Sequence, residues 1–416
     1  SPYRREALIG AGRYDGLVTL LLCGAICIGV SQYAVPRQRY LCALAVSSLL
    51  CSAVAVLQLF GYNALWLFPY DLGYYDSGLQ YTGAFLGTIG NIDLLCGFYC
   101  LSIPSFSAAF LCAEGKLRPL FAASAAVCLY VLIASRVAAG VLALGICSLI
   151  MLPLLVSNRS RFLRACQLAS LFSAALALAL GLEPQRDGFL FHPEIGAVLL
   201  GLAVLLLALW YILSGKERRA WDSHRLRSVI LIAELVLIIA CLAGIYLLPF
   251  QSGTLYELSE LLHGRVDASF GSARIDIWQQ VLDLVPEHLW LGGGPDTLAL
   301  RLNLHYSRYV EETNRTLAVY VDNAHNAYLG ILVNLGVLGL ASYLGCIVVS
   351  ILSARRSLGT IRFAFFCGLV CFWIQSVFGL DLCIITPLLW MFWGLACAQH
   401  GDKRKEEMLH AESGNL

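Results

Sequence analysis

The chain has 416 residues, of which 59% are hydrophobic and 13% are charged, and its formal net charge is +1. About a quarter of the residues of an ordinary soluble domain are charged, so this composition excludes that class. The near-neutral charge gives no indication of a nucleic-acid partner.

Apolar runs recur along the whole chain, each roughly long enough to cross a hydrocarbon core of about 30 Å. They are too long and continuous for the strands of a barrel, and only helices or closed barrels pair their backbone polar groups in lipid. We therefore predict an all-α polytopic membrane protein, a single integral membrane domain over residues 1–416 with about eleven transmembrane helices. The predicted helices cover residues 16–35, 40–60, 92–113, 117–134, 137–156, 163–182, 195–214, 228–250, 325–352, 363–380 and 383–399.

The first residues indicate a fragment. The chain begins with Ser1 rather than Met, and residues 1–15 show no signal-peptide pattern. We interpret the chain as lacking earlier helices, so that the full-length protein would have more than are counted above.

Lysine and arginine gather in alternate loops, and this bias sets the orientation of a membrane protein. One set of loops holds 18 of the 28 basic residues: 36–39, 114–118, 157–164, 215–227, 353–362 and the tail from 400. We predict that this set, including a cytoplasmic tail over 400–416, faces the cytoplasm. The N-terminal tail and the long segment 251–324 then lie outside. Arg4, Arg5 and Arg13 in that tail run against the rule, which again indicates a fragment.

The segment 251–324 is a large extracytoplasmic loop, far longer than an ordinary connection, and such length indicates a functional element. Residues 274–285 predict a short amphipathic helix at the membrane surface, with Ile275, Trp278 and Leu282 on one face. Other apolar residues lie close beside that face: Ile277, Val281, Leu284 and Val285. A glycine-rich turn follows at 292–296. Residues 297–312 then predict a second short helix.

Two arginines are candidates for an anion site. The loop 251–324 holds five Arg, no Lys and ten Asp or Glu, so an anion there must be bound by particular arginines. Arg274 lies in this loop, and its guanidinium either pairs with Asp276 or grips phosphate oxygens bidentately. Arg136 follows Ser135 at the outer junction of the fourth and fifth helices. It either reaches to the lipid headgroups or faces an anionic substrate.

His325 is the third candidate, at the boundary between the outer loop and a membrane helix. Imidazole titrates near physiological pH and can accept a proton from an acceptor hydroxyl. The polar neighbours Asp322, Asn323 and Asn326 include a group that could set the tautomer of the ring. The alternative is a histidine that only caps or packs against the helix.

The cysteines and histidines do not form a recognisable metal motif. All sixteen cysteines lie in the apolar runs, and Cys96/Cys100 and Cys367/Cys371 are each one helical turn apart. We interpret these pairs as packing residues rather than half of a metal site. We expect neither a metal ion nor a cofactor.

Several stretches resemble, in their order along the chain, the signature of the O-antigen ligase/polymerase family. Asp93 departs from that signature, since relatives often carry asparagine there. The stretch over 322–328 reads Asp-Asn-Ala-His-Asn-Ala-Tyr. The six stretches occupy residues 83–91, 135–136, 274–278, 292–296, 322–328 and 336–339.

The resemblance implies a GT-C-like glycosyltransferase in the bacterial cytoplasmic membrane with its active site outside. It would transfer or polymerise a glycan, without metal, from an undecaprenyl-diphosphate-linked donor onto a glycan, lipid or protein acceptor. Arg136 and Arg274 would hold the diphosphate, and His325 would activate or orient the acceptor hydroxyl. Its neighbours Asp322, Asn323 and Asn326 would contact the substrate.

The sequence does not distinguish a ligase from a polymerase. Polymerases often have two substantial outer loops, whereas one dominates here, which favours a ligase. The acceptor, the glycan, the Gram type of the source and the oligomeric state are open as well.

Two other classes remain as alternatives. A transporter or flippase for lipid-linked oligosaccharides would have charged residues near the bilayer midplane, where this chain has Glu234 and little else. A wall polymerase of the shape-and-division type would use a catalytic acid such as Asp267, Asp276 or Asp296. The His-Asn signature argues against that third class.

Overall fold

The computed structural model describes residues 2–60, 62, 65, 67, 87–185, 188–215, 221–267, 270–302, 305–310, 315–379 and 382–398, without the side chains of 183–189, 272 and 303–320. The predicted tail over 400–416 and residues 83–86 lie outside the described residues.

Each predicted apolar run coincides with a helix, which confirms the all-helical membrane class. By length and composition, seven helices of the described part are suited to cross a membrane, and four apolar helices are shorter. The longer ones are α3 (Gln38–Leu59), α4 (Ile92–Cys112), α6 (Ala138–Leu155), α7 (Arg159–Gly181), α8 (Pro193–Ser214), α9 (Ser223–Leu247) and α13 (Ala327–Ala354) with the η5 turn (Arg355–Ser357). The shorter ones are α2 (Leu17–Tyr33), α5 (Arg118–Ala134), α14 (Ile361–Gln375) and α15 (Thr386–Cys397).

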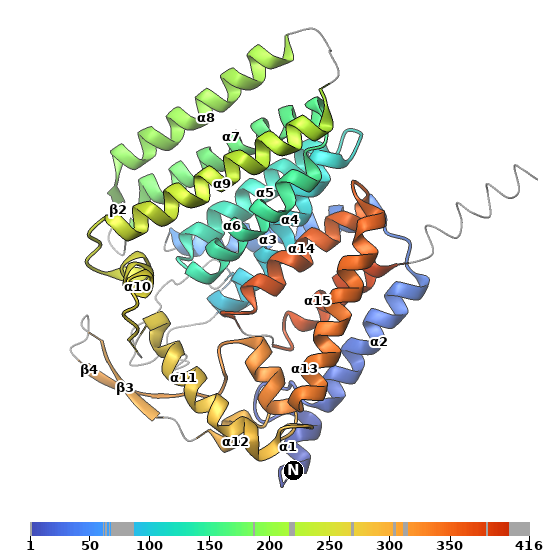
Figure 1. Ribbon diagram of the computed structural model, residues 1–416, viewed down its shortest axis with the longest axis vertical. Coiled ribbons are helices and arrows are strands. Elements are labelled where there is room, and N and C mark those ends of the chain that lie inside the picture. The colour runs from blue at the N-terminus through green and yellow to red at the C-terminus, as the bar shows by residue number, and fades with distance from the viewer. Residues whose placement is uncertain are drawn as a thin grey trace, which may run out of the picture.

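The main core surrounds α4, whose membrane window is 94% buried, with α3, α5, α6 and α14 packed around it. Glycines allow the close approach of α14, because a Cβ at Gly368 would overlap the carbonyl oxygen of Leu101. In contrast, α8 and α9 are only 6% buried and lie at the periphery (Figure 1). Their exposed apolar side chains suit contact with lipid.

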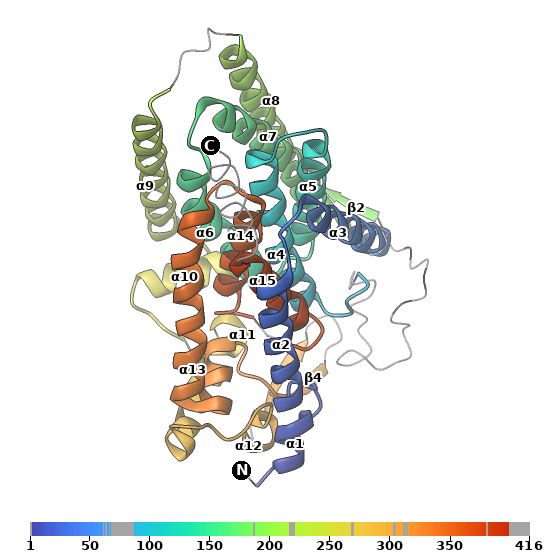
Figure 2. The ribbon, with the colours of Figure 1, turned by 90° about the vertical axis from the view of Figure 1, so that its right-hand side faces the viewer.

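A second, smaller core lies in the outer segment. The elements there are α10 (Gly253–Leu262), α11 (Phe270–Leu284), η3 (Val285–His288) and α12 (Leu298–Arg301). Its buried residues come from α11, α12, the start of α13 and the loop before it: Ile277, Val281, Leu298, Leu302, Val321, Ala324 and Val333. The N-terminal α1 (Arg4–Ile9) lies at the same end of the molecule as α12 (Figure 2), where the Tyr3 hydroxyl donates to the carbonyl of Leu300 at 3.3 Å.

The predicted helix over 297–312 is wrong beyond Arg301. The chain instead forms β3 (His305–Val310), which pairs antiparallel with β4 (Arg315–Tyr320). Both strands are rich in aromatic and β-branched residues, which favour extended structure once a partner strand is present. A second short hairpin joins α7 to α8 through β1 (Leu182–Gln185) and β2 (Gly188–Phe191).

The predicted amphipathic helix exists as α11, and its burial is centred on one side of the predicted apolar face. Ile277 and Val281 are 1% and 0% exposed and Trp278 packs against them, whereas Leu282 is 47% exposed. The protein core next to α11, rather than the spacing of its apolar residues alone, selects this face.

The apolar run over 325–352 is not one straight helix. α13 is interrupted at Gly336, which has φ 70° and ψ −173°. The ring centroids of Tyr328 and Tyr343 are 6.0 Å apart. Along a straight α-helix, the rise between those positions would be about 22 Å. The two parts of α13, 327–335 and 337–354, therefore fold back on each other.

Residues 289–294 pair the backbone groups that the interruption leaves without helical partners. This contact, which we call the glycine lock, comprises four hydrogen bonds: Gly293 N to Val333 O (3.1 Å), Gly294 N to Asn334 O (2.9 Å), Val337 N to Leu289 O (2.9 Å) and Leu338 N to Trp290 O (3.3 Å).

Only glycine fits at the centre of the glycine lock. A Cβ at Gly336 would overlap the carbonyl of Trp290, and a Cβ at Gly292 would overlap the carbonyl of Asn334. Both glycines also have positive φ. The two glycine-rich stretches of the sequence, 292–296 and 336–339, are therefore two halves of one contact.

We predict that Gly336→Ala lowers the melting temperature of the purified protein. Essentially only glycine adopts the backbone conformation of residue 336, so an alanine there costs of order 1–3 kcal/mol, and its overlap with Trp290 adds to this. Thermal unfolding in detergent, followed by tryptophan fluorescence, measures the loss. Gly345→Ala is the matched control on the same helix, because a Cβ there meets nothing within 4 Å. Equal melting temperatures of the two variants would contradict the glycine lock.

Candidate functional site

The loop before α13 forms the centre of the candidate site. Asn326 caps the helix, since its Oδ1 accepts from the N–H of Leu329 at 3.1 Å. Asn323 Oδ1 accepts from the N–H of His325 at 3.1 Å. These two asparagines, predicted to contact substrate, thus hold the backbone of the loop through their oxygens.

Neighbouring helices fix this loop in place. The Trp278 indole of α11 donates to the carbonyl of Ala324 at 3.0 Å. Ala327 N donates to the carbonyl of Ser376, just after α14, at 2.9 Å. The loop that carries His325 is therefore held between the outer segment and the end of α14.

The surroundings of His325 favour its neutral form. Burial lowers the pKa of the imidazole below its ordinary value of 6.5, and the charge of Arg274 lowers it further. Asp93 and Asp322 act in the opposite direction, and Arg13 again lowers it. The neutral imidazole is the form that can accept a proton.

Arg274 lies in the second turn of α11 and retains hydrogen-bonding capacity. Its Nη1 donates to the carbonyl of Gly271 at 2.9 Å, while its Nε is buried and has no hydrogen-bond partner in the described part of the chain. Asp276, the expected alternative partner, instead accepts from Gln280 at 3.1 Å. The guanidinium is thus held in place from one side and can still bind an anion.

Arg136 lies at the turn between α5 and α6. The start of α6 packs on the first turns of α4, because a Cβ at Gly140 would overlap the thiol of Cys96. Arg136 therefore lies at the same end of the bundle as Asp93. It is not among the charges that shift the pKa of His325.

An ion pair that the sequence reasoning missed joins the N-terminal segment to the site loop. Arg13 Nε and Nη2 donate to the two carboxylate oxygens of Asp322 at 2.7 and 2.8 Å. Asp322, considered as a partner for the His325 ring, is therefore bound to Arg13. The feature of the sequence that could have indicated this ion pair is Arg13 itself, because the positive-inside rule disfavours an arginine in an outer tail.

Asp93 is the second residue that was missed as a site residue. It lies in the first turn of α4, where Asn91 caps the helix by accepting from the N–H groups of Asp93 and Leu94 at 2.8 and 3.1 Å. Its carboxylate acts on the His325 ring across the site. The feature of the sequence that could have identified Asp93 is its departure from the family signature, in which relatives often carry asparagine.

Backbone strain occurs in several of the stretches that carry the sequence motifs. In the described part of the chain, five non-glycine residues have positive φ: Tyr14 (59°), Arg136 (55°), Ala273 (63°), Asp296 (52°) and His325 (47°). Such conformations cost of order 1–3 kcal/mol each and persist at functional sites where the surroundings enforce them. Three of the five, Arg136, Asp296 and His325, lie within the stretches 135–136, 292–296 and 322–328 that the sequence motifs selected.

Asp296 has a structural contact. Its Oδ2 accepts from the N–H of Ala11 at 2.8 Å and of Asp15 at 3.4 Å, which ties the N-terminal segment to the outer loop.

In the described residues, no group of three or more His, Cys, Asp or Glu side chains is arranged to hold a metal ion. The arrangement of Arg274 and His325 can bind an anion and accept a proton.

Residues 195–344 match the model of the O-antigen ligase family. The match includes Arg274, Asp322 and His325, whereas Asp93 and Arg136 precede it. No curated protein matches the chain.

We predict that Arg13→Gln raises the pKa of His325. The substitution removes a cation and releases Asp322, and both changes favour the imidazolium. Diethyl pyrocarbonate modifies the neutral imidazole, so its rate of reaction with His325, measured by mass spectrometry against pH, reports the midpoint. In the wild type the midpoint lies below 6.5, and in the variant it moves upward.

Arg5→Gln is the control for this measurement, because Arg5 is exposed on α1 and is not among the charges that shift the pKa of His325. A midpoint that is the same in Arg13→Gln as in Arg5→Gln would show that the ion pair does not act on the ring.

Proposed function

The chain is an O-antigen ligase-like membrane protein, and we propose that it transfers or polymerises a glycan from an undecaprenyl-diphosphate-linked donor onto an acceptor hydroxyl. The reaction takes place at the outer face of the bacterial cytoplasmic membrane and needs no metal ion. The observation that carries the proposal is the placement of Arg274, with its buried Nε unpaired in the described part, in a site where its charge lowers the pKa of His325.

The cationic side chains act on the leaving group. Arg274 holds the diphosphate of the donor, and Arg136 contributes a second guanidinium from the same end of the bundle. When the bond between the anomeric carbon and the diphosphate oxygen breaks, its electron pair leaves with the diphosphate. Guanidinium groups already in place stabilise that developing charge and so replace a metal ion.

His325 acts on the acceptor. The neutral imidazole accepts the proton of the acceptor hydroxyl while the hydroxyl oxygen forms the new bond to the anomeric carbon. Asp93 then stabilises the imidazolium, and Asp322 contributes less because Arg13 binds its carboxylate. Asn323 and Asn326 are positioning residues that hold the loop.

The orientation of the chain supports an outer site. The N-terminal segment and the outer segment lie on the same side, joined through Arg13–Asp322 and through Asp296. The loops on the opposite side are those rich in Lys and Arg, which favours a cytoplasmic location for them.

Transport of lipid-linked oligosaccharides is the alternative, and the burial of polar residues favours transfer. In the described part of the chain, the buried polar side chains are Ser, Thr, Asn and Gln, without a charged residue among them. Glu234 lies on α9, a peripheral helix. A transport pathway near the bilayer midplane would need further charged or polar residues besides Glu234.

We predict that the purified wild-type protein in liposomes releases undecaprenyl diphosphate and forms a glycosylated product from the host's lipid-linked glycan pool in the presence of EDTA. His325→Ala lowers the rate roughly 10²–10⁴-fold through loss of the base. Arg274→Ala lowers it roughly 10²–10³-fold through loss of charge stabilisation. Product size, a single addition or a ladder, separates ligase from polymerase.

Two matched substitutions in the same outer segment control for general damage. His288→Ala removes an exposed histidine, and Arg265→Ala removes an exposed arginine that pairs with Glu260 at 2.6 Å. Both should transfer at the wild-type rate. Full activity of His325→Ala would refute the assigned site, and movement of the donor across the bilayer without transfer would establish the transporter alternative.

A further inference from the structure

Three turns of the bundle lie at the membrane surface opposite the candidate site: 113–117 between α4 and α5, 156–158 between α6 and α7, and 358–360 before α14. Asp93 lies in the first turn of α4, and the 21 residues of α4 rise by about 30 Å, which is the thickness of a hydrocarbon core. α14 runs the other way, since the carbonyl of Ser376 at its end binds the site loop. The basic residues around these turns favour a cytoplasmic location for them.

Two arginines of α7 contact the other turns at this surface. Arg164 Nη1 donates to the carbonyls of Leu111 and Ala113 at 2.7 and 3.4 Å, where α4 ends. Arg161 reaches the turn before α14, because a Cβ at Gly359 would lie 2.7 Å from its Nη2. The two arginines are three residues apart on one helix, so they lie on the same face of α7.

A third arginine joins them from the first residue of α5. Arg118 Nε donates to the carbonyl of Gly115 at 3.2 Å, in the same turn that Arg164 binds. The charges of Arg118 and Arg161 both act on the Arg164 guanidinium, whereas the exposed Glu114 acts in the opposite direction. In the described part of the chain, none of the three arginines forms an ion pair. We call these three residues the arginine cluster.

The α7 members of the arginine cluster keep accessible donors for an anion. Arg161 Nη1 donates to the carbonyl of Leu155 at 3.3 Å and to Ser157 Oγ at 3.1 Å. Within the described residues, the hydrogen bonds of Arg161 and Arg164 use Nη1 alone, and their Nε and Nη2 are not among the buried atoms that lack a partner. A guanidinium already fixed at one nitrogen loses less side-chain entropy when the others bind an anion.

Exposed leucines flank the arginine cluster. Leu117 precedes Arg118 and is 42% exposed, and Leu358 precedes Gly359 and is 50% exposed. Leucines beside arginines are typical of a surface that contacts a bilayer, where acyl chains cover the leucines and the guanidinium groups reach the phosphates. A soluble anion would leave both leucines in water, so the surroundings favour a lipid.

We propose that the arginine cluster binds the phosphate of an anionic phospholipid in the inner leaflet, with the acyl chains against the two leucines. Guanidinium groups bind phosphate oxygens bidentately, and basic pockets between transmembrane helices at the cytoplasmic surface bind anionic head groups. The stretches 113–118, 157–164 and 353–362 hold eight Lys or Arg, and Glu114 is their one acidic residue. The proposal is independent of the transferase function, because the arginine cluster lies at the opposite membrane surface.

The test measures lipid binding. Native mass spectrometry of the purified protein in detergent determines how much lipid stays bound during a titration. We expect phosphatidylglycerol to bind roughly tenfold more tightly than phosphatidylcholine, whose ammonium group the arginine cluster repels. Arg118→Gln should weaken phosphatidylglycerol binding roughly fivefold, the contribution of one arginine beside an anionic head group. Its hydrogen bond to Gly115 is local, so the variant should fold.

Glu114→Gln should change the affinity in the other direction. It removes the carboxylate that opposes the arginine cluster, so phosphatidylglycerol should bind more tightly than to the wild type. General damage to the fold would not produce such a gain. Unchanged or weaker binding in this variant would contradict the proposal.

Arg227→Gln is the matched control, because Arg227 is exposed at the start of α9 and is not among the charges that act on Arg164. We expect wild-type binding of phosphatidylglycerol. An equal loss in Arg118→Gln and Arg227→Gln would overturn the inference by showing that only the total charge matters. Displacement of the lipid by millimolar inorganic phosphate would overturn it as well, by assigning the arginine cluster to a soluble anion. Equal affinity for the two lipids would have the same consequence.

Discussion

The glycine lock between residues 289–294 and the interrupted α13 is the contact on which the site depends. It turns one apolar run into two helical parts that fold back on each other, so that the first part begins at the His325 loop. Arg301 reinforces it, donating to the carbonyl of Val333 at 3.0 Å and to Asn334 Oδ1 at 2.9 Å. A cation at the C-terminal end of a helical segment also interacts favourably with the helix dipole.

The strained loop is held from several directions. Trp278 binds it from α11, Ser376 from the end of α14, and the Arg13–Asp322 ion pair from the N-terminal segment. This redundancy explains how His325 can keep a positive φ that an isolated loop would relax.

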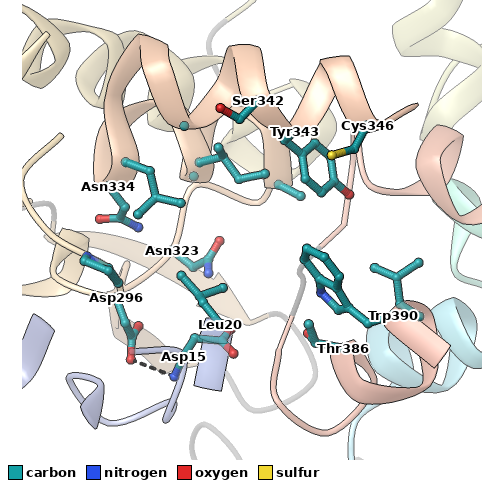
Figure 3. Close-up of a pocket in the computed structure, with 17 residues that line it drawn as sticks. Asp15, Leu20, Asp296, Asn323, Asn334, Ser342, Tyr343, Cys346, Thr386 and Trp390 are labelled. Atoms are coloured by element: carbon teal, nitrogen blue, oxygen red, sulfur yellow. Dashed lines mark hydrogen bonds between the residues drawn. The ribbon is translucent and has the colours of Figure 1, made fainter. Parts of the chain in front are cut away.

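Charges of both signs act on the site loop. Arg274 on α11 and Arg13 in the N-terminal segment lower the pKa of His325, whereas Asp93 on α4 and Asp322 raise it. Asp15 and Asp296 line a groove beside α13 (Figure 3), which Asn323 and Ala327 of the loop also line.

The sequence by itself determined the membrane class and the positions of the helices, because the length and apolarity of a run are local properties. It also predicts Arg136, Arg274 and His325 as candidate site residues, because residue type alone indicates a guanidinium that can bind an anion and an imidazole that can accept a proton. Only the tertiary structure decided the break at Gly336, since nothing local distinguishes it from other helical glycines until Trp290 packs against it. The spacing of residues along the sequence likewise did not predict the Arg13–Asp322 ion pair or the β3–β4 hairpin. Each of them depends on a partner that folding brings into contact.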